Sequence, residues 1–254
     1  MSKLDTDPYK GVRDFYPEDM KIQNYIFNMW RKVVEEKGYE EYSASLLEPT
    51  EIYTEKSGAE IVNEQTFTFT DRGDRSVTLR PEMTPSLARM VAAQRKSLKF
   101  PLRWYSIPNL FRYERPQRGR KREHWQLNVD LLGVSGIEAD KEIVSIAYKI
   151  MKEFGARDED FEIRINNAEV EVFKDIAPNI VSDPTLARGQ TYYTGMVFEI
   201  FDTNKDNLRA LAGGGRYDNL LELFGVEPVP AVGFAAGDMG MRDFLETHGL
   251  PTHA

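Results

Sequence analysis

The segment between residues 104 and 132 constrains the fold more than any other part of the chain. Residues 124–132 alternate apolar and polar side chains, as a strand with one buried face does. A basic loop that contains Gly119 connects this run to residues 104–113. We therefore predict two antiparallel strands, over residues 104–113 and 124–132, joined as a hairpin. The apolar members of the second strand are Trp125, Leu127, Val129 and Leu131.

Other segments also have the pattern of β-strands. Residues 66–70 and 76–79 alternate with period two around the turn Asp71-Arg72-Gly73-Asp74, which predicts a second hairpin. Three further strands are predicted at residues 161–165, 196–201 and 231–235.

Three segments have helical periodicity. The first helix is predicted from about Pro17 to Lys37, where apolar residues recur on one face and Gly38 follows as a terminator. A longer helix is predicted from about Glu138 to Phe154. A short helix is predicted after Pro85. Its inward residues are expected to be Leu87, Met90 and Val91.

These elements predict one α+β domain over residues 1–254, with an antiparallel β-sheet flanked by helices. The strands occur as hairpins, and the helices do not alternate regularly with them. No G-x-G-x-x-G segment stands between a strand and a helix, and no Walker lysine motif is present, which disfavours the doubly wound nucleotide-binding folds. No repeat or linker indicates an internal domain boundary.

The composition excludes several classes of protein. Lysine and arginine number 33 against 41 acidic residues, a net charge of −8, so only a local basic patch would attract nucleic acid. The absence of cysteine excludes disulfides and thiolate metal sites, and the three histidines lack metal-ligand spacing, so no metal site is predicted in the protein itself. No stretch approaches the roughly 20 apolar residues that span a bilayer, and residues 1–5 do not resemble a secretory signal. We therefore expect a cytoplasmic protein with no membrane association.

The basic segment from Arg112 to Arg122 is the most specific chemical feature. Arg112 and Glu114 are two residues apart, so on a strand they would point to the same face. A guanidinium can bind phosphate through two hydrogen bonds, and a carboxylate can accept a hydrogen bond from an amine such as that of adenine. Together the pair suits ATP, although an isolated Arg-x-Glu is more often a cross-strand salt bridge.

Five segments in chain order extend this observation. They are Thr78-Leu79-Arg80-Pro81-Glu82-Met83-Thr84, Phe111-Arg112-Tyr113-Glu114-Arg115-Pro116-Gln117-Arg118-Gly119-Arg120, Ala187-Arg188-Gly189-Gln190-Thr191-Tyr192-Tyr193-Thr194-Gly195, Ala212-Gly213-Gly214-Gly215-Arg216-Tyr217-Asp218 and Pro230-Ala231-Val232-Gly233-Phe234. They resemble the motifs of the class II aminoacyl-tRNA synthetases, and of the histidyl branch in particular. The resemblance covers nearly the whole chain. It implies the class II catalytic fold, activation of histidine with ATP to histidyl-adenylate, and transfer of histidine to tRNA(His).

The resemblance also implies how ATP is bound. Arg112 and Arg188 would be the catalytic pair at the α-phosphate, Glu114 would meet adenine, and Arg120 would bind the departing phosphates. Mg²⁺ would bridge the phosphates. The reaction needs these cations because a carboxylate must attack a phosphate that already carries negative charge.

The histidine pocket is implied in the same way. Glu82, Thr84 and Gln126 would hold the ammonium group, and Asp130 and Tyr193 would meet the imidazole. The pocket would be completed by Tyr192, Gly213, Gly215 and Tyr217. The glycines would let the backbone approach the ligand closely, although a glycine run can equally be a plain turn.

Two kinds of macromolecular partner are implied. The loop residues Arg115, Gln117 and Arg118 would contact the tRNA acceptor end. A homodimer is expected around the first helix and a strand from Gly38 to Glu48, the segment that corresponds to motif 1.

The chain departs from the family pattern in four places. At about residues 168–184 a short connector replaces a helical insertion, and the sequence stops at residue 254 without an anticodon-binding domain, so we expect no anticodon contact. Gly240 occupies the position of the motif 3 arginine, and we assign ATP binding to the nearest arginine, Arg242. Ser45 stands where motif 1 usually has proline, and Gln190-Thr191 replaces Leu-Asp.

An alternative function is the histidine-sensing regulatory subunit of ATP phosphoribosyltransferase, a synthetase-like protein that lacks the anticodon-binding domain. That alternative leaves the phosphate-directed arginines without a task, so we favour the enzyme. A catalytically silent dimeric scaffold would need only the core residues. Histidine-dependent exchange of pyrophosphate into ATP distinguishes the enzyme from both.

Overall fold

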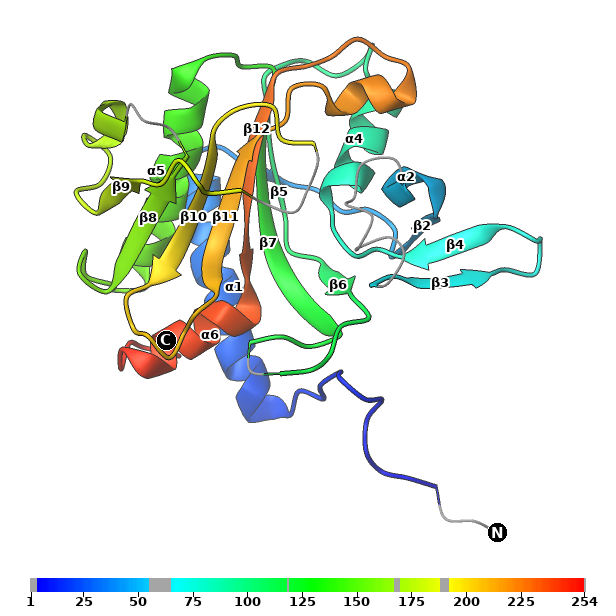
Figure 1. The fold of residues 1–254 in the computed structure, drawn as a ribbon. Helices are drawn as coiled ribbons and strands as arrows, with labels where there is room; N and C mark the ends of the chain where they lie inside the picture. The colour runs from blue at the N-terminus through cyan, green and yellow to red at the C-terminus, as the bar shows by residue number, and fades with distance from the viewer. Residues whose placement is uncertain (1–3, 55–64, 118, 167–169, 188–191, 254) are drawn as a thin grey trace.

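The protein is described by a computed structural model over residues 4–54, 65–117, 119–166, 170–187 and 192–253. Figure 1 shows a large sheet with two long helices along one face and a small sheet set to one side. The predicted α+β class, an antiparallel sheet flanked by helices, is confirmed.

The large sheet forms the centre of the molecule. Its described strands are β1 (Glu40–Glu41), β5 (Leu102–Ser106), β6 (Asn109–Phe111), β7 (Glu123–Leu132), β8 (Phe161–Ile165), β9 (Ile180–Ser182), β10 (Val197–Asp202), β11 (Ala210–Arg216) and β12 (Ala231–Gly237). Their spatial order is β1-β5-β7-β12-β11-β10-β8-β9, and β6 also pairs with β7. All pairs are antiparallel except β1 with β5 and β8 with β9, which are the two edges of the sheet.

Helices cover one face of this sheet. They are α1 (Pro17–Glu36), α5 (Ile137–Glu153) and α6 (Asp238–Thr247). The core between these helices and the sheet includes Trp30, Leu127, Ile143, Phe198 and Phe244. A second cluster is formed by α4 (Thr84–Ala93), η2 (Leu220–Phe224), neighbouring loops and the end of β7, and it includes Leu87, Leu132, Tyr192, Tyr217 and Leu220. Within the described residues, no helix has the length and apolar content needed to cross a membrane.

Strand β7 links the core to the functional face of the sheet. Leu127, Val129 and Leu131 face the helical core and are fully buried, as their alternation predicted. Asn128 and Asp130 belong to the opposite face, yet they are also buried. Buried polar side chains on this second face indicate that a polar ligand could bind there.

The small sheet contains the second predicted hairpin. It consists of β2 (Leu47–Pro49), β4 (Ser76–Leu79) and β3 (Phe67–Thr70), in the order β2-β4-β3. A short helix, α2 (Glu51–Thr54), follows β2. The structure therefore confirms the hairpin and adds β2 to it.

Three sequence-based expectations about the elements were wrong. The strand predicted over residues 104–113 is interrupted at Pro108, which has no N–H to donate, and becomes β5 and β6. The segment Gly38 to Glu48 is not one strand, because β1 and β2 belong to different sheets. Met90 is only half-buried, and Ala88 lies inside with Leu87 and Val91.

The glycine run is also not a turn. Gly213 to Gly215 lie within β11, between β10 and β12. A Cβ atom on Gly214 would lie 2.0 Å from the carbonyl oxygen of Gly233 on β12. Glycine is therefore required here by the close approach of two strands.

A buried ion pair joins the sheet to α5. Arg216 at the end of β11 donates to Asp140 in the first turn of α5, with Nε and Nη2 at 3.0 and 2.6 Å from the same carboxylate oxygen. Its Nη2 also donates to the carbonyl oxygen of Gly136, at 2.9 Å. Both ionic side chains are about one-tenth exposed, so the loss of one partner would leave the other charge buried.

We predict that Arg216→Met lowers the free energy of unfolding by about 3 kcal/mol or more, because Asp140 would lose its counter-charge in a buried site. Urea denaturation followed by circular dichroism measures the change. The matched control is Lys21→Met, which removes an exposed ion pair with Glu18 and should cost less than about 1 kcal/mol. Equal losses for the two variants would show that the Arg216 pair does not join α5 to the sheet.

Candidate active site

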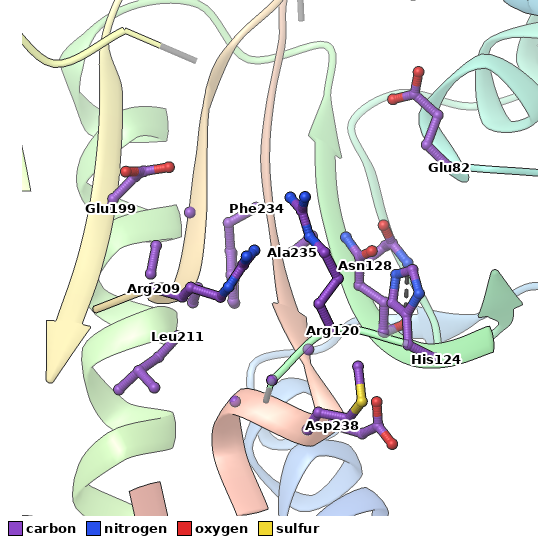
Figure 2. Close-up of a pocket in the computed structure, with 18 of the residues that line it drawn as sticks. Glu82, Arg120, His124, Asn128, Glu199, Arg209, Leu211, Phe234, Ala235 and Asp238 are labelled. Atoms are coloured by element: carbon purple, nitrogen blue, oxygen red, sulfur yellow. Dashed lines mark hydrogen bonds between the residues drawn. The ribbon is translucent and has the colours of Figure 1, made fainter. Parts of the chain in front are cut away.

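A cavity of about 680 Å³ opens on the face of the sheet opposite α1 and α5. Alternate residues of the central strands line its floor, because the intervening residues face the helical core. These floor residues are Gln126, Asn128 and Asp130 of β7, Gly233 and Ala235 of β12, Gly213 of β11 and Glu199 of β10. Figure 2 shows several of them directed into the cavity.

One end of the cavity holds a buried carboxylate. Asp130 is 3% exposed, and Oδ1 accepts a hydrogen bond from the hydroxyl of Tyr217. Its other oxygen, Oδ2, is buried and has no hydrogen-bond partner within the described part of the chain. Burial raises the pKa of Asp130 to about 7, although the Tyr217 hydrogen bond acts in the opposite direction. An unpaired buried acceptor of this kind is costly unless a ligand donates to it.

The surroundings of Asp130 depend on a glycine of β12. A Cβ atom on Gly233 would lie 2.5 Å from Oδ1 of Asp130 and 3.0 Å from the hydroxyl of Tyr217. Any side chain at residue 233 would therefore separate these two groups. On the adjoining wall, the hydroxyl of Tyr192 donates to Glu82 Oε2 at 3.1 Å.

The opposite end of the cavity is basic. Its cations are Arg112, Arg120, Lys121 and Arg209. Arg120 pairs with Glu114, and Arg112 donates from Nε to the carbonyl oxygen of Pro81 at 2.9 Å. Figure 2 shows the side chains of Arg120 and Arg209 extending into the same part of the cavity. Clustered guanidinium groups of this kind suit a polyphosphate.

His124 adds a neutral ring to the basic end. The residue lines the cavity, and burial lowers its pKa to about 3, with a further contribution from the Arg112 cation. Its imidazole is therefore uncharged at neutral pH. A flat neutral ring among cations can stack against a base without adding positive charge.

The cavity brings together most of the residues predicted from the sequence. These are Glu82, Thr84, Arg112, Glu114, Gln117, Arg120, Gln126, Asp130, Tyr192, Tyr193, Gly213 and Tyr217. Arg112 and Glu114 reach it from a loop, since β6 ends at Phe111, so the assumption that they share a strand face was wrong. Glu114 also forms a salt bridge, as the alternative interpretation of this segment expected, but its partner is Arg120.

Five predicted site residues are not brought to the cavity by the described structure. Arg118 and Arg188 lie outside the described residues. Arg242 is turned away, because its guanidinium donates to Asp19 of α1 at 3.2 Å and to Glu246 at 2.8 Å. Arg115 borders a separate surface depression with Lys10 and Lys121. Gly215 instead permits the approach of β10, because a Cβ there would lie 2.4 Å from the carbonyl oxygen of Met196.

Sequence reasoning missed several lining residues. Asn128 and Glu199 were detectable, since each alternates with core residues on a predicted strand. His124 received no role from the sequence, because the three histidines lack metal-ligand spacing. Arg209 precedes β11, a strand that the sequence analysis did not predict, so no pattern directed it to the cavity.

Metal binding by the chain alone has no support in the described residues. They contain no cluster of three or more His, Asp or Glu side chains that could hold an ion. Mg²⁺ in nucleotide sites, however, usually binds through one or two carboxylates together with substrate phosphates and water. The cavity floor provides such a carboxylate in Glu199.

Comparison with known proteins gives this geometry a context. The sequence model of the family described as histidyl-tRNA synthetase matches residues 11–180 and 169–238. The histidine–tRNA ligase of Leptospira biflexa is 38% identical over 331 aligned residues, which cover 98% of this chain and 76% of the relative. The alignment is longer than the 254 residues of this chain, so the relative has additional residues within it.

Solved structures agree with the fold. Apo histidyl-tRNA synthetase of S. aureus is 28% identical, with a TM-score of 0.80, over 99% of this chain and 72% of that one. A Bacillus halodurans protein described as an ATP phosphoribosyltransferase regulatory subunit/histidyl-tRNA synthetase has a TM-score of 0.80, over 94% of this chain and 84% of its own. At 22% identity, that second likeness concerns the fold alone.

Because the family model matches most of the sequence and a histidine–tRNA ligase aligns with nearly all of it, the chain belongs to the histidyl-tRNA synthetase family.

Proposed function

We propose that the chain activates histidine with ATP to form histidyl-adenylate and transfers the histidyl group to tRNA(His). The observation that carries this proposal is the buried, unpaired oxygen of Asp130 at one end of a cavity whose other end is lined with arginines. A ligand that satisfies both ends must donate a hydrogen bond at one end and carry phosphate at the other. Histidine and ATP, bound side by side, meet this requirement.

At the acidic end, Asp130 accepts a hydrogen bond from the imidazole N–H of histidine. Tyr193 meets the other side of the ring, and Glu82, Thr84 and Gln126 bind the ammonium group. A site with a buried acceptor rejects an apolar side chain strongly, because the acceptor would remain unpaired. Tyr192, Tyr217, Gly213 and Gly215 shape the pocket; of these, Gly215 acts indirectly, through the spacing of β10 and β11.

At the basic end, Arg112 and Arg188 hold the α-phosphate while the histidine carboxylate attacks it. Arg120 binds the departing phosphates and Glu114 meets adenine, so ATP would have to separate the ion pair that these two residues form. Mg²⁺ would be held by the phosphates with Glu199, and it neutralises phosphate charge when bound. We do not assign Arg242 to ATP, because its guanidinium is held by Asp19 and Glu246.

The macromolecular partners are proposed from the family. Arg115, Gln117 and Arg118 of the basic loop would contact the acceptor end of tRNA. A homodimer would form around α1 and the segment that contains β1 and β2, and the enzyme would act in the cytoplasm. The segment around residues 168–184 would take the place of the family's insertion domain; the two matches to the family model meet there, at residues 169–180.

The regulatory-subunit alternative has less support. A sensor needs the histidine end of the cavity but not a cluster of cations opposite it. Histidine–tRNA ligases of Leptospira biflexa and Opitutus terrae match over most of the chain, whereas the likeness to the Bacillus halodurans protein is one of fold.

We predict histidine-dependent exchange of labelled pyrophosphate into ATP. The purified chain should catalyse this exchange with histidine and not with glutamine, phenylalanine or the other amino acids. Histidine binding without exchange would contradict the enzyme and favour the sensor.

We also predict that Asp130→Asn weakens histidine binding by about 1 to 3 kcal/mol and leaves ATP binding nearly unchanged, because a charged acceptor is lost only at the histidine end. In the parent, the ionised carboxylate is the stronger acceptor for the imidazole N–H. The ratio of the histidine affinity of the parent to that of the variant should therefore be largest above pH 7 and decrease as the pH falls below it. Calorimetric titrations between pH 6 and 8 measure both effects.

Protonation of histidine in solution is the same in both titrations, so it cancels in the ratio of the two affinities. The control is Asp175→Asn, which changes an exposed carboxylate outside the cavity. Equal losses of histidine and ATP affinity in Asp130→Asn would refute the assignment of this end to histidine.

A further inference from the structure

Arg209 is a cavity cation to which neither the sequence motifs nor the proposed roles above assign a task. It lies immediately before β11 and lines the basic end of the cavity. Within the described residues, its guanidinium forms no ion pair or side-chain hydrogen bond. A positioned cation without a protein partner is a candidate to bind an anionic ligand.

The neighbours of Arg209 belong to the proposed nucleotide site. Desolvation lowers its pKa first, followed by repulsion from the Arg120 cation, while Glu114 acts in the opposite direction. Its Cδ atom would lie 3.7 Å from a Cβ atom placed on Gly119 in the basic loop. Arg209 therefore faces the loop that carries Arg120, from the other side of the cavity (Figure 2).

The Arg120 and Arg209 cations repel each other, and an anion bound between them would offset that repulsion. Glu114 offers one negative charge and is already paired with Arg120. Asp206 and Asp243 also line this end, so carboxylates surround the two cations without neutralising the Arg209 guanidinium through an ion pair among the described residues. A polyphosphate presents several oxygens to both guanidinium groups at once.

Helix α6 borders the same end of the cavity, beside β11. Gly240, in the first turn of α6, lines the same end of the cavity and contributes no side chain. A Cβ atom there would touch only Leu211 of β11, at 3.8 Å, so the wall has room for a side chain. Arg242, two residues later, is held outside the cavity.

We propose that Arg209 binds the polyphosphate of ATP together with Arg120, and that it supplies from the β11 side the guanidinium that the α6 wall lacks at Gly240. This inference rests on the proposed function, since ATP is the ligand that function requires. Arg209 is then a nucleotide-binding residue, and its removal affects ATP and not histidine.

The test compares Arg209→Ala and Arg209→Lys with the parent. Arg209→Ala should raise the KM for ATP in pyrophosphate exchange roughly tenfold or more, the scale of one lost charged hydrogen bond, and leave the KM for histidine within about twofold. Arg209→Lys should recover part of the loss, because it restores charge without the planar fork. The control is Arg164→Ala, on β8, whose guanidinium packs on Phe201. An unchanged KM for ATP, or equal changes in both KM values, would overturn the proposal.

Calorimetry without histidine separates this proposal from the proposed function. The affinity of Arg209→Ala for ATP should fall more than its affinity for AMP, because AMP lacks the β- and γ-phosphates. Equal losses would mean that Arg209 contacts the base or the α-phosphate, which contradicts a polyphosphate role. These titrations remain informative even when the parent shows no exchange, an outcome that would refute only the proposed function.

An arginine introduced at residue 240 tests whether a guanidinium from α6 can take the place of the one from Arg209. Adding Gly240→Arg to Arg209→Ala should restore at least part of the ATP affinity, since the new side chain starts at the same end of the cavity. A thermal melt of each variant confirms that it is folded. A folded double variant with no recovery would refute the claim that Arg209 supplies what the wall at Gly240 lacks.

Discussion

The contact between Asp130, Tyr217 and Gly233 is the constraint on which the rest of the site depends. Strands β7 and β12 must pack without a side chain at residue 233, or Asp130 and Tyr217 could not meet. The same close spacing continues to β11, where Gly214 has no room for a Cβ atom. The glycines of the central strands therefore create the space in which a polar ligand can reach a buried carboxylate.

This arrangement has an energetic consequence for the folded state. The pKa of Asp130 in the folded protein, about 7, lies above its ordinary value of 3.8. The ionisation of Asp130 therefore lowers the free energy of unfolding. This loss is complete above pH 7 and is absent below the ordinary pKa of the side chain. A donor that reaches Oδ2 offsets this cost, so a hydrogen bond from imidazole is favoured at this oxygen.

The sequence predicted most of the architecture because its elements have strong periodicity. Helix α1 ends at Glu36, and Gly38, two residues later, has the positive φ that suits a helix terminus. The alternation in β7 correctly identified its buried face. Twelve of the predicted site residues line one cavity, although neither composition nor spacing reveals which distant segments meet. Resemblance to a family supplied that information, since it encodes a three-dimensional arrangement that local patterns do not contain.

The wrong or missing predictions concern segments whose structure is set by tertiary contacts. Strand β11 is rich in glycine, which is disfavoured in strands, and it forms because β10 and β12 require its small residues. Arg242 was assigned to ATP by its position in the sequence, but Asp19 of α1 holds its guanidinium elsewhere. Arg209 and His124 enter the cavity from segments whose spatial neighbours cannot be deduced from sequence spacing.

The most direct test of the account is to detect histidyl-adenylate itself. The purified chain is mixed with excess ATP, Mg²⁺ and labelled histidine, quenched in acid after a single turnover, and analysed by mass spectrometry. The account predicts that histidyl-adenylate accumulates in proportion to the protein. It predicts none when glutamine replaces histidine. Histidine bound in proportion to the protein, with no adenylate at any time, would contradict it.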